Sequence, residues 1–362
     1  MQIQPEPEVA QEWIEGVRQI VKQPRVFKYL DKLTQLTKTY LASLPEEERA
    51  KVGVNETKDK KTYLIELAEQ LLPTQDKKMR DYAQSWLEAS QVHVDAGLYR
   101  HVVEFFRPEE GLLVDLGCGV GRLLAEWPYE SAIGVDINHY CLQATEKLLG
   151  ESGRKARRFS KSYISFDPEK GLVLKPYPVM EEVDLSKTVL LLDDVETLHN
   201  TIRVLYNHGR KADAVAYILQ GGHTNRSPIN FIDVQACGNY DEFVKQRKQL
   251  DAMKMYHNVA NNVGKICKSG GRFLFGIRYS VVDDEGRFVD TNSDQIGEEF
   301  ARMHQNIDVV RTSQIPMESE RGLGGIQMTT VLDQTSDGKK PSFDISKLDL
   351  RYNLYLFDAR VK

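Results

Sequence analysis

Apolar residues recur every three or four positions through the first hundred residues of the chain. Trp13, Val17 and Ile20 begin one such stripe, and similar stripes run through residues 26–44 and from residue 64 onward. This spacing is typical of amphipathic helices. It predicts a helical N-terminal cap over residues 1–105, with a polar connection at 45–61 and a long or broken helix over 76–106.

From residue 111 the pattern changes to short apolar runs separated by helical stretches. This alternation predicts an α/β domain over residues 106–362, with a doubly wound, mostly parallel sheet. The Ser-Gly-Gly sequence at 269–271 is expected to end a helix before a strand. The expected strands are 112–116, 132–136, 188–193, 214–219 and 272–278, and the expected helices are 121–127, 140–149, 196–208 and 241–267.

The rest of the domain contains a tail and two insertions. The tail predicts a helix near 296–304 and strands at 308–315, 326–332 and 352–358, two of which form an antiparallel hairpin at the sheet edge. One insertion, near 151–187, contains an alternating segment, 158–175, that predicts a hairpin around the turn at 167–171. The other, near 221–240, is a long polar loop after a strand.

A glycine-rich turn follows the first predicted strand. Asp115 lies near the end of that strand, and Gly117, Gly119 and Gly121 follow at alternate positions before a helix begins. Glycines allow a sharp turn and close approach of the backbone to a ligand, and the free N–H groups of the helix start favour negative charge. The position of these glycines between a strand and a helix indicates a ligand-binding loop.

Acidic residues also end the next two predicted strands in chain order. Asp136 ends the second strand, and Asp193 and Asp194 end the third. A carboxylate at the end of the second strand is able to accept hydrogen bonds from both hydroxyls of a ribose. Each acid alone is also compatible with a helix cap or a turn, but their joint placement favours a binding site.

Together, these segments resemble the class I S-adenosylmethionine-dependent methyltransferases, whose first motif is an acid followed by glycines at alternate positions. The resemblance covers most of residues 106–362 and includes the glycine turn before strand 272–278. It implies a Rossmann-like methyltransferase fold, transferase activity and S-adenosyl-L-methionine as cofactor. The cofactor contacts that we infer from it are Asp115, Gly117, Cys118, Gly119, Gly121, Asp136, Ile137, Asp194, Val195, Gln220 and Tyr99.

The resemblance also implies roles for these residues. The glycines pass under the methionine and ribose of the cofactor, Asp115 holds the loop or the ammonium group, and Asp136 binds the ribose. Asp194 meets the adenine, with Asp193 as the competing alignment. Tyr82, Trp86, Tyr99 and His101 lie on the helical segment entering the sheet, where the family often places side chains over the methionine end; core packing explains the apolar members equally well.

A nucleotide-dependent dehydrogenase is the main alternative to this resemblance. Its fingerprint needs a third glycine or alanine three residues after the second glycine, and Arg122 or Leu124 stands there in the two possible registers. The methyltransferase pattern therefore fits better.

The polar loop after the fourth predicted strand is expected to handle the methyl acceptor, because ligands of such sheets bind beyond the carboxyl ends of the strands. Gln220, His223 and Asn225 lie there, and His223 is the candidate catalytic base, although a surface histidine explains it as well. The loop lacks the aromatic, proline-rich tetrapeptide of many amino-methylating nucleic-acid enzymes.

Composition and charge narrow the substrate class. Hydrophobic residues make up 41% and charged residues 28% of the chain, and the net charge is −5, which disfavours nucleic acid without excluding it. The basic run at 153–162 is expected to be a solvated hairpin face rather than a phosphate site. The four cysteines fit reduced thiols, with no metal site.

The chain is expected to be cytoplasmic and not membrane-bound, since the first residues lack the apolar core of a signal peptide and no apolar run reaches spanning length. We predict methyl transfer to oxygen or nitrogen of a small molecule. The alternatives are an RNA or protein methyltransferase and a catalytically silent S-adenosylmethionine-binding protein. The sequence does not predict the oligomeric state.

Overall fold

The structure is a computed structural model. It describes residues 1–43, 46–50, 52–53, 59–95, 97–168, 171–218, 252–279, 281–282, 288–289, 298, 301, 304–317 and 352–362.

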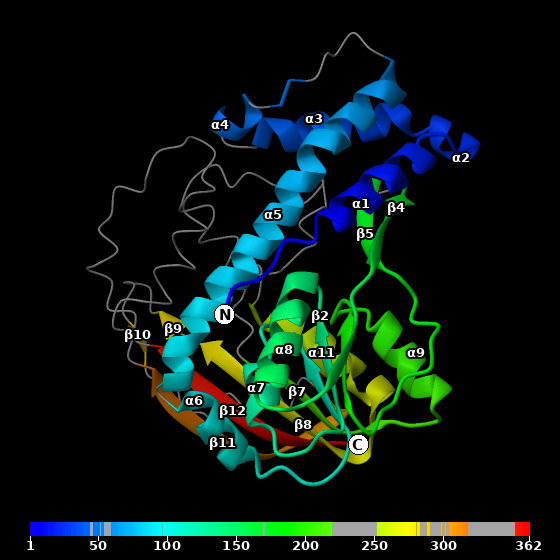
Figure 1. Cartoon of the computed structure of the whole chain (residues 1–362). Coiled ribbons are helices and arrows are strands. Elements are labelled where there is room, and N and C mark those ends of the chain that lie inside the picture. The colour runs from blue at the N-terminus through cyan, green and yellow to red at the C-terminus, as the bar shows by residue number, and fades with distance from the viewer. Residues whose placement is uncertain are drawn as a thin grey trace.

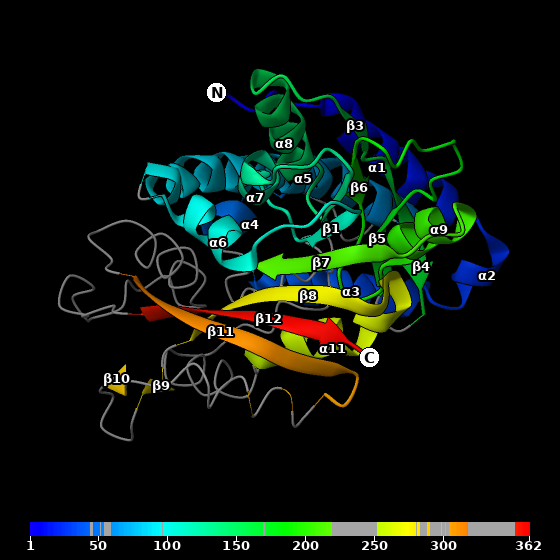
Figure 2. The same cartoon turned by 90° about the horizontal axis from the view of Figure 1, so that it is seen from below.

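A twisted eight-stranded sheet forms the centre of the described part of the molecule (Figures 1 and 2). The strand order is β11-β12-β8-β7-β1-β2-β6-β3. Pairing is parallel from β3 through β8 and antiparallel where β12 joins β8 and β11. The strands are β1 (Leu113–Leu116), β2 (Ala132–Asp136), β3 (Ala156–Phe159), β6 (Thr188–Leu192), β7 (Ala212–Ile218), β8 (Cys267–Tyr279), β11 (Ile307–Met317) and β12 (Tyr352–Val361).

Helices cover both faces of this sheet. Helices α6 (Leu98–Phe106), α7 (Arg122–Glu126) and α8 (His139–Glu151) lie on one face, and α9 (His199–Asn207) and α11 (Ala252–Ile266) on the other. The central strands are buried on both sides because their side chains alternate between two hydrophobic clusters, one for each helical layer. The predicted doubly wound, mostly parallel α/β fold is therefore confirmed.

The N-terminal region is helical, as predicted, within its described residues. It contains α1 (Pro7–Ile20), α2 (Pro24–Phe27), α3 (Leu30–Ser43), α4 (Glu46–Arg49) and α5 (Lys60–Asp95). The long helix α5 runs across the molecule from the tip of the cap to the sheet (Figure 1). Gly97, with a left-handed φ of 72°, precedes α6, so the predicted helix over 76–106 is broken near its C-terminal third.

The inserted hairpin is also confirmed. Strands β4 (Ser162–Asp167) and β5 (Gly171–Pro176) pair antiparallel outside the main sheet. The hairpin packs against the cap, where Trp13 Nε1 donates a hydrogen bond to Ser162 Oγ at 3.0 Å. One hydrophobic cluster joins side chains of α1, α5, α8 and both hairpin strands.

Two details differ from the sequence prediction. Residues 156–159 form β3, a parallel edge strand of the main sheet, instead of opening the hairpin. Residues 269–271 lie inside β8, because α11 ends at Ile266 and the strand begins at Cys267. Gly270 has a φ of 74° and the β7–β8 register shifts there, so these glycines form an irregularity within a strand instead of a helix stop.

The tail agrees with the prediction where it is described. Strands β11 and β12 form the expected antiparallel pair at the sheet edge, and two short strands, β9 (Val281–Val282) and β10 (Phe288–Val289), pair with each other. The predicted strand at 326–332, most of the helix near 296–304 and residues 241–251 of the predicted long helix lie outside the described residues.

Candidate functional site

The glycine loop begins at the carboxyl end of β1, in the middle of the sheet. Gly117, Gly119 and Gly121 all have positive φ angles, of 63°, 54° and 79°. The Cys118 N–H donates to Val135 O at 2.8 Å, which fastens the loop to β2. A Cβ on Gly121 would clash with the side chain of Thr145 on α8, so glycine is needed here for both its dihedral angle and its size.

Asp136, at the end of β2, holds the loop from the neighbouring strand. Its Oδ2 accepts a hydrogen bond from the Gly119 N–H at 2.9 Å, and its Oδ1 accepts one from the Asn138 N–H at 2.8 Å. Burial raises the pKa of Asp136 to about 6, although these backbone N–H groups and that of Ile137 act to lower it. The carboxylate therefore lies in a poorly solvated position with lone pairs left for further donors.

Asp115, next to the end of β1, is the second acid of the site. Its side chain is 3% exposed, and its Oδ2 accepts no hydrogen bond from the residues that the structure describes. Burial, followed by the nearby Asp136 carboxylate, raises the pKa of Asp115 well above its ordinary value. No described lysine or arginine forms an ion pair with either acid. Two buried carboxyl groups thus share a place that suits a ligand with positive charge or N–H and O–H donors.

Asp193 and Asp194 have different surroundings. Asp193 is buried, and its Oδ2 accepts hydrogen bonds from the Thr201 N–H at 2.8 Å and the Thr201 hydroxyl at 2.9 Å. Asp194 is half-buried, and its Oδ1 accepts a hydrogen bond from the Glu196 N–H at 2.9 Å. Asp193 is therefore used to hold the start of α9, which favours Asp194 as the ligand contact. That assignment remains a prediction.

Other predicted contact residues lie near the loop. Tyr99 is buried in the hydrophobic cluster that also contains Cys118 and Leu123, and Ile137 and Val195 are half-buried at the ends of β2 and β6. Burial raises the pKa of the Cys118 thiol well above its ordinary value, which disfavours thiolate chemistry. Their contacts with a ligand remain predictions.

The predicted acceptor residues cannot be placed. Gln220, His223 and Asn225, together with the insertion at 221–240, lie outside the described residues. The proposed base therefore remains a prediction from the sequence.

Contacts between α5 and the glycine loop involve Trp86, which the resemblance implied near the cofactor, and Arg122, for which no role was predicted. Arg122, the first residue of α7, donates hydrogen bonds from Nε to Ser90 Oγ at 3.0 Å and from Nη2 to Leu87 O and Gln91 Oε1, each at 3.1 Å. On the next turn of α5 toward its start, Trp86 contacts Gly119. The arginine directly after the third glycine was visible in the sequence, but nothing local indicated its partner.

The basic run at 153–162 is used within the protein. Arg154 donates to two backbone carbonyls, of Leu124 and Trp127. Arg157 pairs with Glu181, and Arg158 pairs with Glu6 at 2.8 Å and Glu146 at 3.1 Å. The expected hairpin position is wrong, because residues 156–159 form the edge strand β3. The expected solvent exposure is confirmed for Lys155, Arg157 and Lys161, whereas Arg154 and Arg158 are engaged by carbonyls and carboxylates.

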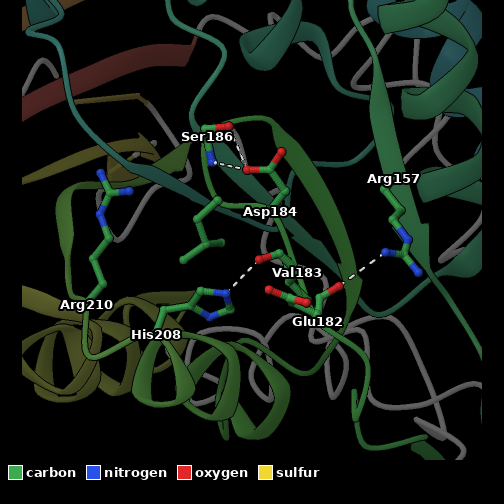
Figure 3. Close-up of a pocket in the computed structure, with 8 residues that line it drawn as sticks. Arg157, Glu182, Val183, Asp184, Ser186, His208 and Arg210 are labelled. Atoms are coloured by element: carbon green, nitrogen blue, oxygen red, sulfur yellow. Dashed lines mark hydrogen bonds between the residues drawn. The ribbon is translucent and has the colours of Figure 1, made fainter.

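A separate pocket of about 580 Å³ lies at the opposite edge of the sheet (Figure 3). Its lining comes from segments that precede β6 and β7 and from β3. Both ring nitrogens of His208 lie close to backbone carbonyls, of Val204 at 2.7 Å and Val183 at 2.6 Å, and the Asp184 carboxylate accepts from Ser186. Because its polar groups are already engaged and it lies at the amino ends of the strands, this pocket does not compete with the glycine loop as the candidate site.

The described residues contain no cluster of three or more His, Cys, Asp or Glu side chains arranged to hold a metal ion. None of the described helices is long and apolar enough to cross a membrane.

Comparisons with known proteins give likeness of fold only. No protein-family model matches the chain, and no curated protein sequence matches it. One similar solved structure is TrmN from Thermus thermophilus, with 8% sequence identity and a TM-score of 0.34 over 73% of this chain and 48% of TrmN. Another is TehB from Haemophilus influenzae, with 13% identity and a TM-score of 0.36 over 74% of this chain and 62% of TehB. The alignment thus spans about half of TrmN and less than two thirds of TehB.

Another similar structure is the glycopeptide N-methyltransferase MtfA, solved with S-adenosyl-L-methionine. It has 12% sequence identity and a TM-score of 0.32 over 73% of this chain and 92% of MtfA. At these identities and TM-scores the similar structures do not show the function of this chain.

Proposed function

We propose that the protein is an S-adenosylmethionine-dependent methyltransferase. The observation that carries this proposal is that three glycines with left-handed φ angles and two buried acids, Asp115 and Asp136, lie at the carboxyl ends of the neighbouring strands β1 and β2. Ligands of doubly wound sheets bind at this edge. The glycine spacing and the arginine at position 122 favour this cofactor over a dinucleotide.

The residues present fit the charge and the donors of this cofactor. S-adenosylmethionine carries a sulfonium and an ammonium group, and its ribose has two hydroxyl donors. Asp136 has lone pairs left for the hydroxyls, and the unpartnered Oδ2 of Asp115 suits an N–H donor. A positive ligand would also offset the unfavourable burial of the two acids. Asp194 and Val195 are proposed to meet the adenine, on the resemblance alone.

The protein has to contribute little to the chemical step itself. When bound, the cofactor supplies a methyl group already activated by its attachment to a sulfonium. The chain then needs to align an acceptor lone pair with the carbon–sulfur bond and keep water out. We propose His223 as the base that removes a proton from a hydroxyl or protonated amine acceptor.

We propose that the acceptor is a small molecule methylated on oxygen or nitrogen. Arg154 and Arg158 of the basic run at 153–162 are engaged by internal carbonyls and carboxylates, so the exposed cations left for phosphates are Lys155, Arg157 and Lys161, of which Arg157 pairs with Glu181. This weighs against an RNA acceptor, whose binding depends on such cations.

Calorimetric titration tests the cofactor assignment. We expect binding of S-adenosylmethionine and S-adenosylhomocysteine but not of NAD, and a loss of affinity of about 10- to 100-fold in Asp136→Ala, which removes a charged hydrogen-bond acceptor. The exposed acid Asp184, at the other edge of the sheet, provides the matched control Asp184→Ala. Binding of NAD alone, or no binding by the wild-type protein at millimolar ligand, would contradict the proposal.

Transfer of a labelled methyl group separates the remaining alternatives. We expect incorporation into small hydroxyl or amine compounds and not into structured RNA or protein. Binding without transfer to any of the three would instead identify a silent S-adenosylmethionine-binding protein.

A further inference from the structure

Trp86 of α5 lies directly against the glycine loop. If Gly119 carried a Cβ, that atom would be 2.9 Å from Trp86 Nε1 and 3.4 Å from Cδ1, with no other indole atom within 4 Å. The indole therefore meets Gly119 with the edge of its five-membered ring. A ring that meets the loop by one edge has its faces left for other neighbours, and the cap's hydrophobic cluster and His93 are among them.

The indole is held in this position from two sides. Arg122, three residues after Gly119, fastens α5 to the loop through the Leu87 carbonyl and the side chains of Ser90 and Gln91. The ring of His93 makes an edge contact with Trp86, with centroids 6.4 Å apart and planes at 76°. Trp86 itself is half-buried, so part of the indole remains open to a ligand.

The two acids beside the glycine loop would attract a cation to a position next to the indole ring. Gly119 donates its N–H to Asp136, and the Asp136 carboxylate lies close enough to Asp115 to raise the pKa of that acid, after the larger effect of burial. A cation attracted by these two acids and resting on the loop next to Gly119 would lie beside the indole. The face of an indole ring attracts cations through its quadrupole and does so better than other aromatic side chains.

We propose that Trp86, contributed by the N-terminal cap, is a wall of the cofactor site whose ring face contacts the sulfonium and so distinguishes S-adenosylmethionine from neutral S-adenosylhomocysteine. This inference rests on the proposed function. It makes α5 part of the cofactor site, with Arg122 as the residue that positions it. It also gives the product a physical reason to leave, because the product lacks the charge that the ring favours.

Titration of the two ligands into Trp86 variants tests this role. We expect Trp86→Leu to weaken S-adenosylmethionine roughly 2- to 30-fold, the range of a cation–ring contact, and S-adenosylhomocysteine by no more than about twofold. Trp86→Phe keeps a ring face but loses the indole N–H, so it should retain most of the discrimination. Phe27→Leu, at an exposed aromatic position elsewhere in the cap, is the matched control and should change neither affinity.

Tryptophan fluorescence of the wild-type protein gives a second measurement that does not depend on the folding of a variant. Trp13 and Trp127 are 0% and 2% exposed, so ligand contact at Trp86 should dominate any change in emission on addition of S-adenosylmethionine, and the change should be lost in Trp86→Phe.

The outcomes separate this inference from the function on which it rests. If the wild-type protein binds neither ligand, the proposed function and the role of Trp86 are both overturned. If it binds S-adenosylmethionine but Trp86→Leu weakens both ligands equally or neither, or if binding leaves the wild-type emission unchanged, only the role of Trp86 is overturned.

Discussion

Asp136 of the candidate site also affects the stability of the protein, because its pKa differs between the folded and unfolded chain. Its pKa in the folded chain is about 6, against an ordinary value of 3.8, so between these pH values the folded state holds a proton that the unfolded chain releases. The contribution of this proton to the free energy of unfolding is therefore fully present at low pH and is lost as the pH rises from about 4 to about 6. The shift corresponds to a loss of about 3 kcal/mol.

Urea unfolding between pH 4 and 7 checks this slope. Asp136→Asn cannot ionise, so its unfolding free energy should change less over that window. Asp115 and Asp193, whose pKa values burial also raises, leave a residual slope of the same sign in both proteins. An asparagine variant with the full wild-type slope would show that the pH dependence comes from other groups.

Gly121 allows a matched comparison of two glycines. Gly121→Ala places a methyl group against Thr145 in a left-handed conformation, and we expect a loss of about 2 to 4 kcal/mol in unfolding free energy. Gly150 lies in helix α8 with nothing within 4 Å of its missing Cβ, so Gly150→Ala should raise stability by up to about 1 kcal/mol. Thermal and urea unfolding measure both, and equal effects would refute the steric argument.

Among the elements, those with strong local patterns were predictable from the sequence. The apolar runs of β1, β2, β6, β7 and β8 and the alternation of the β4–β5 hairpin each indicated the structure that forms. Strand β3 was missed because Arg157 and Arg158 at its centre interrupt any apolar run, and the strand gains its place by pairing with β6. The glycines at 269–271 were misread because a helix stop and a strand irregularity use the same residue.

The site was predictable in part for the same reason. The glycine loop and the acids at the strand ends are local features, each visible within a few residues. The difference between Asp193 and Asp194 depends on Thr201 across a turn, and the contacts of Arg122 and Trp86 join segments about thirty residues apart. Sequence periodicity contains no information on such contacts between elements.

Arg272 connects three elements through one buried side chain. It pairs with Asp358 of β12, with Nη2 and Oδ2 2.7 Å apart, and donates to the carbonyls of Phe106 and Arg107 at the end of α6. Arg272→Met would leave these acceptors buried without that partner, although Arg311 still pairs with Asp358. We expect a loss of about 3 kcal/mol in urea unfolding.

A control variant and a double variant test whether the predicted loss comes from the Arg272–Asp358 pair. Arg360→Met removes an arginine that donates an exposed hydrogen bond to the Gly270 carbonyl and should cost less than about 0.5 kcal/mol in unfolding free energy. Arg272→Met combined with Asp358→Leu should lose less than the sum of the two single changes. Strict additivity would mean that the pair does not interact.

In the whole molecule, the cap and the sheet domain share a hydrophobic cluster. Trp13 and Leu64 of the cap lie in the same cluster as Tyr140 of α8 and Ile164 of the hairpin. We therefore expect residues 1–105 and 106–362 to unfold together, in one calorimetric transition whose van't Hoff and calorimetric enthalpies agree. Two resolved transitions would show that the predicted domains are independent in stability.

The position of β12 has a consequence for the order in which the chain is made. Strand β12 lies between β8 and β11 and hydrogen-bonds to both, although both precede it in the chain. While a ribosome is still synthesising residues 318–351, the open edge of β8 and the whole of β11 have no partner in this sheet. Unpaired edges of this kind favour association with other chains, so the nascent chain is expected to depend on chaperone protection until β12 has emerged.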